Sequence, residues 1–140
     1  MFRKILMAYD GSQGANRALA VGIDLAKIHG SELWVLAVEE KLPRFSATID
    51  EVQEEKQFAN DQYGKLLEAA KVRAKEAGIE LKTLMRPGHP AQTIVSAAKE
   101  GKFDLVLVGH SGLSGVWAAF LGTTAEKVSR HAPCSVLIVR

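Results

Sequence analysis

Short apolar runs alternate along the chain with segments whose apolar residues recur at helical spacing, and this alternation constrains the fold more than any other feature. Near-continuous apolar runs are typical of strands buried on both faces, and amphipathic helices between them cover a parallel sheet. Right-handed crossovers then favour a doubly wound α/β sheet. The predicted strands are Arg3–Tyr9, Glu32–Val38, Ile79–Met85, Asp104–Val108 and Ser135–Val139.

Residues that begin and end helices stand between these strands. Ser12 is a good N-cap for the first predicted helix, and Gly30 ends that helix. Thr123 and Glu126 match the T-x-x-E capping box at the start of the last helix. The predicted helices cover about residues 13–29, 51–77, 90–100 and 123–131.

The connection from the fourth strand to the last helix, residues 109–124 (GHSGLSGVWAAFLGTT), is rich in glycine. Gly109, Gly112 and Gly122 allow a ligand to approach the backbone where a Cβ atom would collide. The N–H groups at the start of the following helix, with the positive end of its dipole, form a natural anion site. We expect the phosphates of a nucleotide here; the alternative is a turn that only requires positive φ.

Further candidate residues follow the carboxyl ends of the predicted strands, where doubly wound sheets bind ligands. Asp10 ends the first strand and either serves such a site or caps the turn that follows it. His110 and Ser111 either bond phosphate or ribose or are solvated loop residues. Trp117 and Phe120 either cover the nucleotide or pack in the core or against a partner subunit.

Composition excludes several classes of partner. The net charge, 18 − 16 = +2, is too small to favour nucleic acid or an anionic membrane. No segment approaches the ~20 apolar residues of a membrane helix. A length of 140 residues predicts a single domain, 1–140. Cys134 is the only cysteine, which rules out an internal disulfide and fits a reducing compartment, so we expect a cytoplasmic protein.

Several motifs that handle phosphates, esters or metals are absent. Thr123 rather than lysine follows Gly122, so there is no P-loop lysine. No G-x-G-x-x-G follows the first strand, and residues 109–113 miss the last position of the nucleophile elbow. No pair of His or Cys has metal-ligand spacing. Any Mg²⁺ or Mn²⁺ should therefore arrive with the phosphates.

The spacing Gly109-x2-Gly112-x9-Gly122-Thr123 resembles the nucleotide-binding signature of the universal stress protein family, in its ATP-binding branch. The opening KILMAYDGS, the turn PGHPAQTIV, the strand FDLVLVG and the closing APCSVLIVR are also similar to that family, so the resemblance covers the whole chain. It implies a five-stranded sheet of order 3-2-1-4-5, ATP at the switch point and a homodimer. Ser135 stands where the family often has proline.

The resemblance also implies roles for individual residues. Asp10 would face the ribose and phosphates near a metal, and Val38 would offer backbone atoms to the adenine. The glycines, with Thr123 and Thr124, would cradle the ribose and phosphates. The residues that we expect around the ligand are Ala8, Tyr9, Asp10, Ala37, Val38, Gly109, His110, Ser111, Gly112, Gly122, Thr123 and Thr124.

The last predicted strand, Ser135–Val139, would lie at an edge of the sheet. An apolar edge strand that is left open invites aggregation. Pairing with its own copy about a twofold axis would cover it, so the sequence predicts a homodimer through this strand.

Together these observations predict an ATP-binding stress-response or regulatory protein that acts as a nucleotide-dependent switch or binding module. The first alternative is a slow ATPase or phosphotransferase that uses Asp10 and Mg²⁺. The others are a binder of another adenine nucleotide, such as cyclic AMP, and a dimeric scaffold whose site holds nothing. The sequence shows no general base or arginine finger, which favours binding over turnover.

Overall fold

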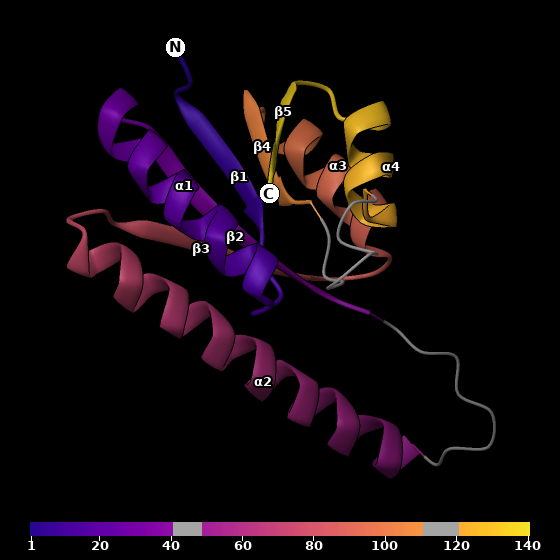
Figure 1. The fold of residues 1–140 in the computed structure, drawn as a ribbon. Coiled ribbons are helices and arrows are strands. Elements are labelled where there is room, and N and C mark those ends of the chain that lie inside the picture. The colour runs from indigo at the N-terminus through magenta and orange to yellow at the C-terminus, as the bar shows by residue number, and fades with distance from the viewer. Residues whose placement is uncertain (41–48, 111–120) are drawn as a thin grey trace.

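Five parallel strands form one sheet in the computed structural model, and helices cover both of its faces (Figure 1). The structure describes residues 1–40, 49–110 and 121–140. The strand order is β3-β2-β1-β4-β5, which confirms the predicted doubly wound topology. The strands are β1 (Lys4–Ala8), β2 (Glu32–Glu39), β3 (Leu81–Pro87), β4 (Leu105–Gly109) and β5 (Ser135–Val139). The helices are α1 (Gln13–His29), α2 (Ile49–Glu76), α3 (Pro90–Glu100) and α4 (Thr123–His131).

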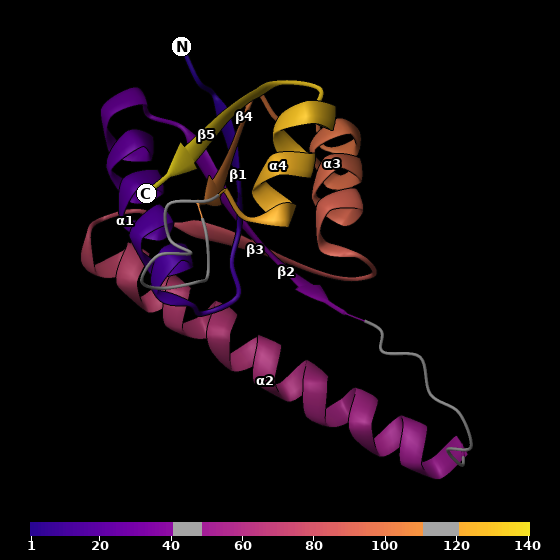
Figure 2. The same ribbon diagram turned by 45° about the vertical axis from the view of Figure 1, so that its right-hand side comes forward.

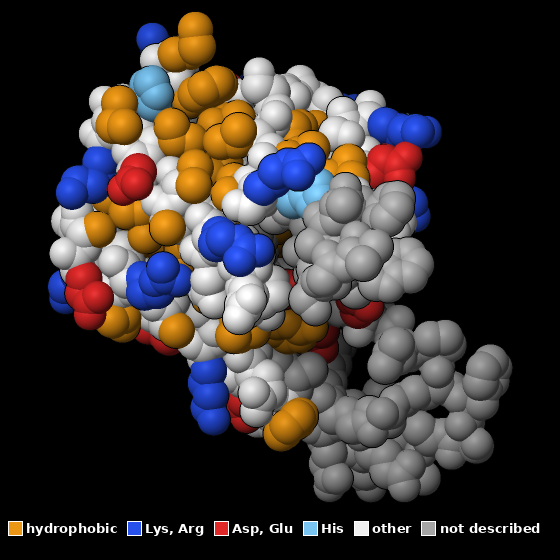
Figure 3. Space-filling model, viewed as in Figure 1, with side chains coloured by type: hydrophobic (Ala, Val, Ile, Leu, Met, Phe, Trp, Pro, Cys, Tyr) orange, Lys and Arg blue, Asp and Glu red, His pale blue; other side chains and the backbone are white. Residues whose placement is uncertain are grey.

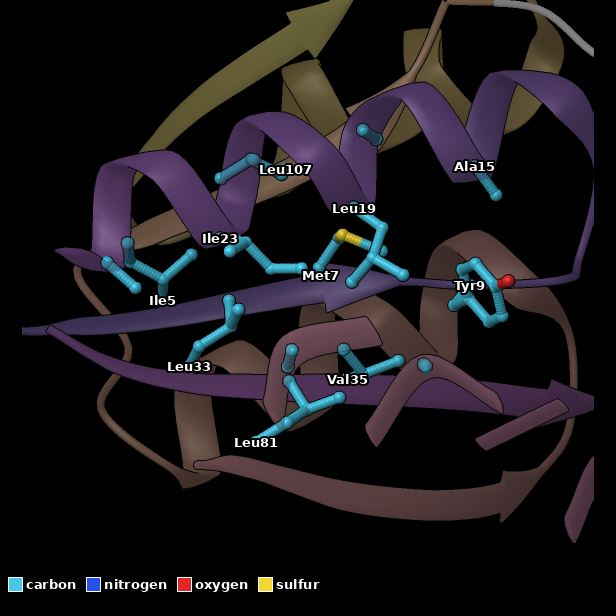
Figure 4. Packing of buried hydrophobic residues seen from close by; sticks show 14 of the residues in the cluster. Ile5, Met7, Tyr9, Ala15, Leu19, Ile23, Leu33, Val35, Leu81 and Leu107 are labelled. Carbon is cyan, nitrogen blue, oxygen red and sulfur yellow. The ribbon is translucent and has the colours of Figure 1, made fainter. Parts of the chain in front are cut away.

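The central strand β1 is buried on both faces. Ile5, Leu6 and Met7 expose none of their surface. Ile5 and Met7 belong to the core under α1 and α2, whereas Leu6 belongs to the core under α3 and α4. Figure 4 shows Met7 beside Leu19 of α1, with Tyr9 at one end of the same cluster. Successive residues of one apolar run therefore serve two cores, which is why the run does not alternate with polar residues.

The predicted caps of α1 are confirmed. The Ser12 hydroxyl accepts a hydrogen bond from the N–H of Ala15 at 3.2 Å. Gly30 ends the helix in the left-handed conformation, with φ at 64°. A cap of either kind satisfies a backbone group that the helix itself leaves without a partner.

The predicted capping box at Thr123 is wrong, because α4 begins one residue earlier than the box requires. The N-cap is Gly122, whose carbonyl accepts the N–H of Glu126 at 2.9 Å, so Thr123 already belongs to the first turn. The Glu126 carboxylate pairs with Arg130 at 2.9 Å instead of reaching back to a cap. Within the described residues, no side chain caps α4.

The long helix α2 packs on the sheet with only part of its length. Leu67, Ala70 and Ala74, in its C-terminal half, are buried in the core that α1 also covers. The N-terminal half extends beyond the sheet in both ribbon views (Figures 1 and 2), and the side chain of Phe58 there is 66% exposed. None of the helices within the described ranges has the length and apolar character needed to cross a membrane.

Gly109 ends β4 where the strand meets the N-terminus of α1. A Cβ atom at this position would lie 3.1 Å from the carbonyl carbon of Gly14 and 3.2 Å from its oxygen. These atoms belong to backbone and cannot rotate away. The close approach of α1 to β4 therefore requires glycine at position 109, whatever the site binds.

We predict that Gly109→Ala lowers the free energy of unfolding by about 1–3 kcal/mol, because the added methyl group forces backbone apart. Urea unfolding of the purified variant measures this change. An unfolding midpoint equal to that of the wild type would show that α1 shifts freely and would contradict the packing argument.

Gly64→Ala is the matched control, and its expected effect has the opposite sign. Gly64 lies inside α2, and a Cβ atom there would meet nothing within 4 Å. Alanine in a helix interior is favoured over glycine by about 1 kcal/mol, so this variant should unfold at higher urea concentration than the wild type.

Candidate functional site

A cavity of about 540 Å³ lies beyond the carboxyl ends of β1, β2 and β4. It occupies the edge of the sheet where doubly wound folds bind ligands, next to the point where the winding direction reverses. Its lining residues are Ala8, Tyr9, Asp10, Ser12, Gly14, Ala15, Leu36, Val38, Glu40, Tyr63, Pro90, Ile94, Val108, Gly109, His110, Gly122, Thr123, Thr124 and Ala125.

The structure brings most of the predicted site residues to this cavity. The nine that line it are Ala8, Tyr9, Asp10, Val38, Gly109, His110, Gly122, Thr123 and Thr124. Ala37 does not: it is fully buried in the core under α1 and α2. Ser111 and Gly112 lie outside the described residues, as do Trp117 and Phe120.

Three helices present their N-termini to the cavity. Gly14 and Ala15 belong to the first turn of α1, Pro90 is the first residue of α3, and the first turn of α4 supplies Thr123 and Thr124. Ser12 caps α1, but within the described part of the chain α4 has no side-chain cap. The first N–H groups of α4 are therefore donors without a side-chain acceptor there, and the helix dipole adds partial positive charge.

The side of the cavity next to β2 is apolar and also offers backbone groups. Leu36 and Val38 of β2 line it together with Ile94 of α3. The Leu36 carbonyl faces β1, where it accepts the N–H of Tyr9 at 2.9 Å. The N–H and carbonyl groups of alternate residues in a strand point to the same neighbour, so those of Val38 also point toward β1. Since β1 ends opposite Leu36, the groups of Val38 have no strand partner on that side and open toward the cavity. The backbone groups of Ala37 face β3 for the same reason.

Asp10 is exposed at the mouth of the cavity and also serves the turn that follows it. Its carboxylate accepts the N–H of Ser12 at 3.0 Å. The two interpretations of Asp10 from the sequence are thus compatible, because one oxygen bonds the turn while the residue lines the cavity. Glu40 is a second acidic lining residue. In the described residues, no group of three or more acidic, His or Cys side chains could hold a metal ion by itself.

His110 joins two segments that border the cavity. Its N–H donates to the carbonyl of Val139, at the end of β5, at 2.7 Å. Its own carbonyl accepts the N–H of Gly122, the N-cap of α4, at 2.8 Å. The backbone on either side of residues 111–120 is therefore held together at the cavity.

Cys134, which directly precedes β5, is not among the residues that line the cavity. It is half-buried and packs against the core under α3 and α4. Burial, with a smaller effect from the Asp104 carboxylate, raises the pKa of the Cys134 thiol above its ordinary value. The thiol therefore stays protonated near neutral pH, which suits a packing residue better than a nucleophile.

Asn16, which the sequence did not single out, fixes the turn that carries Asp10. Its Oδ1 accepts the Tyr9 hydroxyl at 2.6 Å and the Arg73 guanidinium at 2.9 Å. Its Nδ2 donates to the carbonyl of Gly11 at 3.4 Å. One side chain therefore links the end of β1, the turn and α2. No sequence signal could have found this network, because Arg73 lies 57 residues from Asn16.

We predict that Asn16→Ala lowers the free energy of unfolding by about 1–3 kcal/mol, since it leaves the hydroxyl of the buried Tyr9 without its acceptor. Tyr9→Phe should cost less in the Asn16→Ala background than in the wild type, because the two residues share one bond. Denaturant unfolding of the four proteins measures the coupling. Asn60→Ala, at an exposed position of α2, is the control and should stay within about 0.5 kcal/mol. Additive effects of the two substitutions would contradict the network.

Comparison with known proteins agrees with this fold. The model of the universal stress protein family matches residues 1–140. Universal stress protein YxiE of Bacillus subtilis is 38% identical over the full length of both chains. The solved structure of the universal stress protein UspA from Lactobacillus plantarum is 25% identical and has a TM-score of 0.88, covering 99% of this chain and 98% of that one. A universal stress protein solved in complex with cAMP is 27% identical and has a TM-score of 0.77, covering 99% and 97%. The chain therefore belongs to the universal stress protein family.

Proposed function

We propose that this chain binds ATP in the cavity and acts in the cytoplasm as a nucleotide-dependent switch or binding module. The observation that carries the proposal is the first turn of α4, which has no side-chain cap among the described residues and borders a cavity with an apolar side. Free N–H groups at a helix start suit phosphates, and an apolar wall with backbone groups at Val38 suits a purine.

Gly122 supports a role in ligand approach. Its φ of −63° and ψ of 152° are angles that any residue adopts, so the backbone conformation does not require glycine. The absence of a side chain leaves the start of α4 open to the cavity. Gly109 differs, because its close contact with α1 already accounts for it.

The expected affinity follows from the phosphate contacts. Three or four hydrogen bonds from backbone N–H groups to charged oxygens contribute about 1.5–3 kcal/mol each. Association costs about 4–15 kcal/mol. A net of about −8 kcal/mol corresponds to a micromolar Kd.

The described part of the cavity favours holding a nucleotide over cleaving it. It contains the carboxylates of Asp10 and Glu40 but no lysine or arginine. Mg²⁺ or Mn²⁺ bound to the phosphates would supply the missing positive charge, with Asp10 as the nearby carboxylate. Without an arginine finger, hydrolysis of bound ATP should be slow.

Cyclic AMP is the second candidate ligand. It is supported by the related universal stress protein that was solved in complex with cAMP. The two ligands share adenine and ribose and differ in their phosphates, so competition between them at equal concentration shows which one the site prefers.

We predict that nucleotide bound during purification is released when the protein is denatured, and that chromatography identifies it as intact ATP. Adding about 1 mM ATP with Mg²⁺ should stabilise the ligand-free protein by about 4 kcal/mol at a micromolar Kd, which appears as a higher melting temperature. Recovered ADP with measurable turnover would favour the enzyme. No bound nucleotide, together with no shift in melting temperature, would contradict the proposal.

Gly122→Val tests the start of α4 directly. The variant should keep the melting temperature of the ligand-free protein approximately, because valine accepts these backbone angles, and should lose the shift caused by ATP. Gly64→Ala, measured in parallel, should keep the shift.

We also propose that two copies pair through β5. The strand lies at the edge of the sheet, and the side chain of Leu137 is 36% exposed. Hydrophobic side chains gather on the face over α1 and β5 (Figure 3). A second copy would cover this edge and the apolar side chains beside it.

We predict that the wild type scatters light as a species with twice the mass of one chain at tens of micromolar, and that Leu137→Asp scatters as a single chain. A charged side chain at Leu137 would be buried without a partner in the interface. Val72→Asp, at a position of α2 that is 54% exposed, is the control and should not change the mass. A monomeric wild type would contradict the dimer.

A further inference from the structure

Tyr63 places an aromatic side chain of α2 in the wall of the cavity. It is half-buried, packs against the core under α1 and α2, and also lines the cavity. Tyr9 is the other tyrosine that lines the described part of the cavity, but it is 6% exposed and its hydroxyl donates to Asn16. Of the two tyrosine rings, that of Tyr63 therefore has more surface open to a ligand.

Contacts on neighbouring turns of α2 fix the position of Tyr63. Leu66, one turn further along, packs so closely on Gly11 that a Cβ atom there would lie 2.6 Å from its Cδ2. Arg73 donates to Asn16 of α1 at 2.9 Å. Residues three apart share one face of a helix, so the contact at Leu66 also directs Tyr63 toward the turn that carries Asp10. The ring is thus held beside the cavity by the protein itself.

The two sides of the cavity differ in chemistry. On the side of β4, the first N–H groups of α4, which no side chain caps within the described residues, suit phosphates. On the side of β2, the side chains of Leu36, Val38 and Ile94 form an apolar wall that suits a nucleobase. Because α2 packs on β2 and β3, Tyr63 lies on the side that suits the nucleoside.

We propose that Tyr63 contacts the nucleobase of the bound nucleotide, so that α2 supplies part of the base-binding site. This inference rests on the proposed nucleotide binding. The face of an aromatic ring stacks on a base, whereas it has no attraction for phosphate. Tyr63 therefore determines affinity for the base and leaves affinity for the phosphates unchanged.

The test compares ATP with inorganic triphosphate, each with Mg²⁺, by titration calorimetry on the full chain. Tyr63→Ala and Tyr63→Leu should weaken ATP binding roughly 5- to 150-fold, the loss expected for one stacking contact, and leave triphosphate binding unchanged. Tyr63→Phe keeps the ring and should bind ATP like the wild type. Phe58→Ala removes an exposed aromatic of the same helix that does not line the cavity, and should change neither ligand.

The inference is overturned if Tyr63→Leu binds ATP as tightly as the wild type, or if it loses ATP and triphosphate to the same extent. It is also overturned if Tyr63→Phe is as impaired as Tyr63→Leu. Failure of the proposed function is distinguishable, because it appears as a wild type that does not bind ATP. Circular dichroism of each variant before titration confirms that the fold is kept.

Discussion

The direction of the strands is the constraint on which the rest of the molecule depends. Since all five strands run the same way, every helix that follows a strand starts at the same edge of the sheet. The chain winds to one side of β1 and then to the other, so α1 and α2 cover one face while α3 and α4 cover the opposite face. The cavity and the positive helix ends are both consequences of this arrangement, and among the described lining residues no lysine or arginine accompanies them.

Glycine serves three different physical purposes around the cavity. Gly11 has φ at +80° in the turn after β1, and Leu66 packs where a side chain would stand. Gly109 is needed because α1 approaches β4 too closely for a methyl group. Gly122 has ordinary backbone angles, so its conformation does not require glycine. A substitution should therefore disturb the turn at Gly11, the packing of α1 at Gly109 and the binding of the ligand at Gly122.

The repeat of strands and helices could be predicted from the sequence because it depends on local patterns of apolar residues and caps. The bounds of α4 were predicted correctly, but its cap was not, because Thr123 and Glu126 fit a capping box that the chain does not form. Ala37 was assigned to the site because its neighbour belongs there, although alternate residues of a strand face opposite ways. Asn16 and Tyr63 could not be recognised, because their roles depend on where α2 docks, and the stripe that docks α2 looks like ordinary core packing.

The backbone bonds of His110 have a practical consequence for handling the protein. The carbonyl of Val139 accepts a hydrogen bond from the N–H of His110, and the carbonyl of His110 accepts one from the N–H of Gly122, the N-cap of α4. A fusion joined after Arg140 therefore begins one residue from these linked hydrogen bonds. The other terminus offers a safer attachment point. Met1 is 97% exposed and precedes the start of β1 (Figure 1), whereas the residues that line the cavity lie beyond the end of that strand. An affinity handle or fluorescent label therefore belongs before Met1.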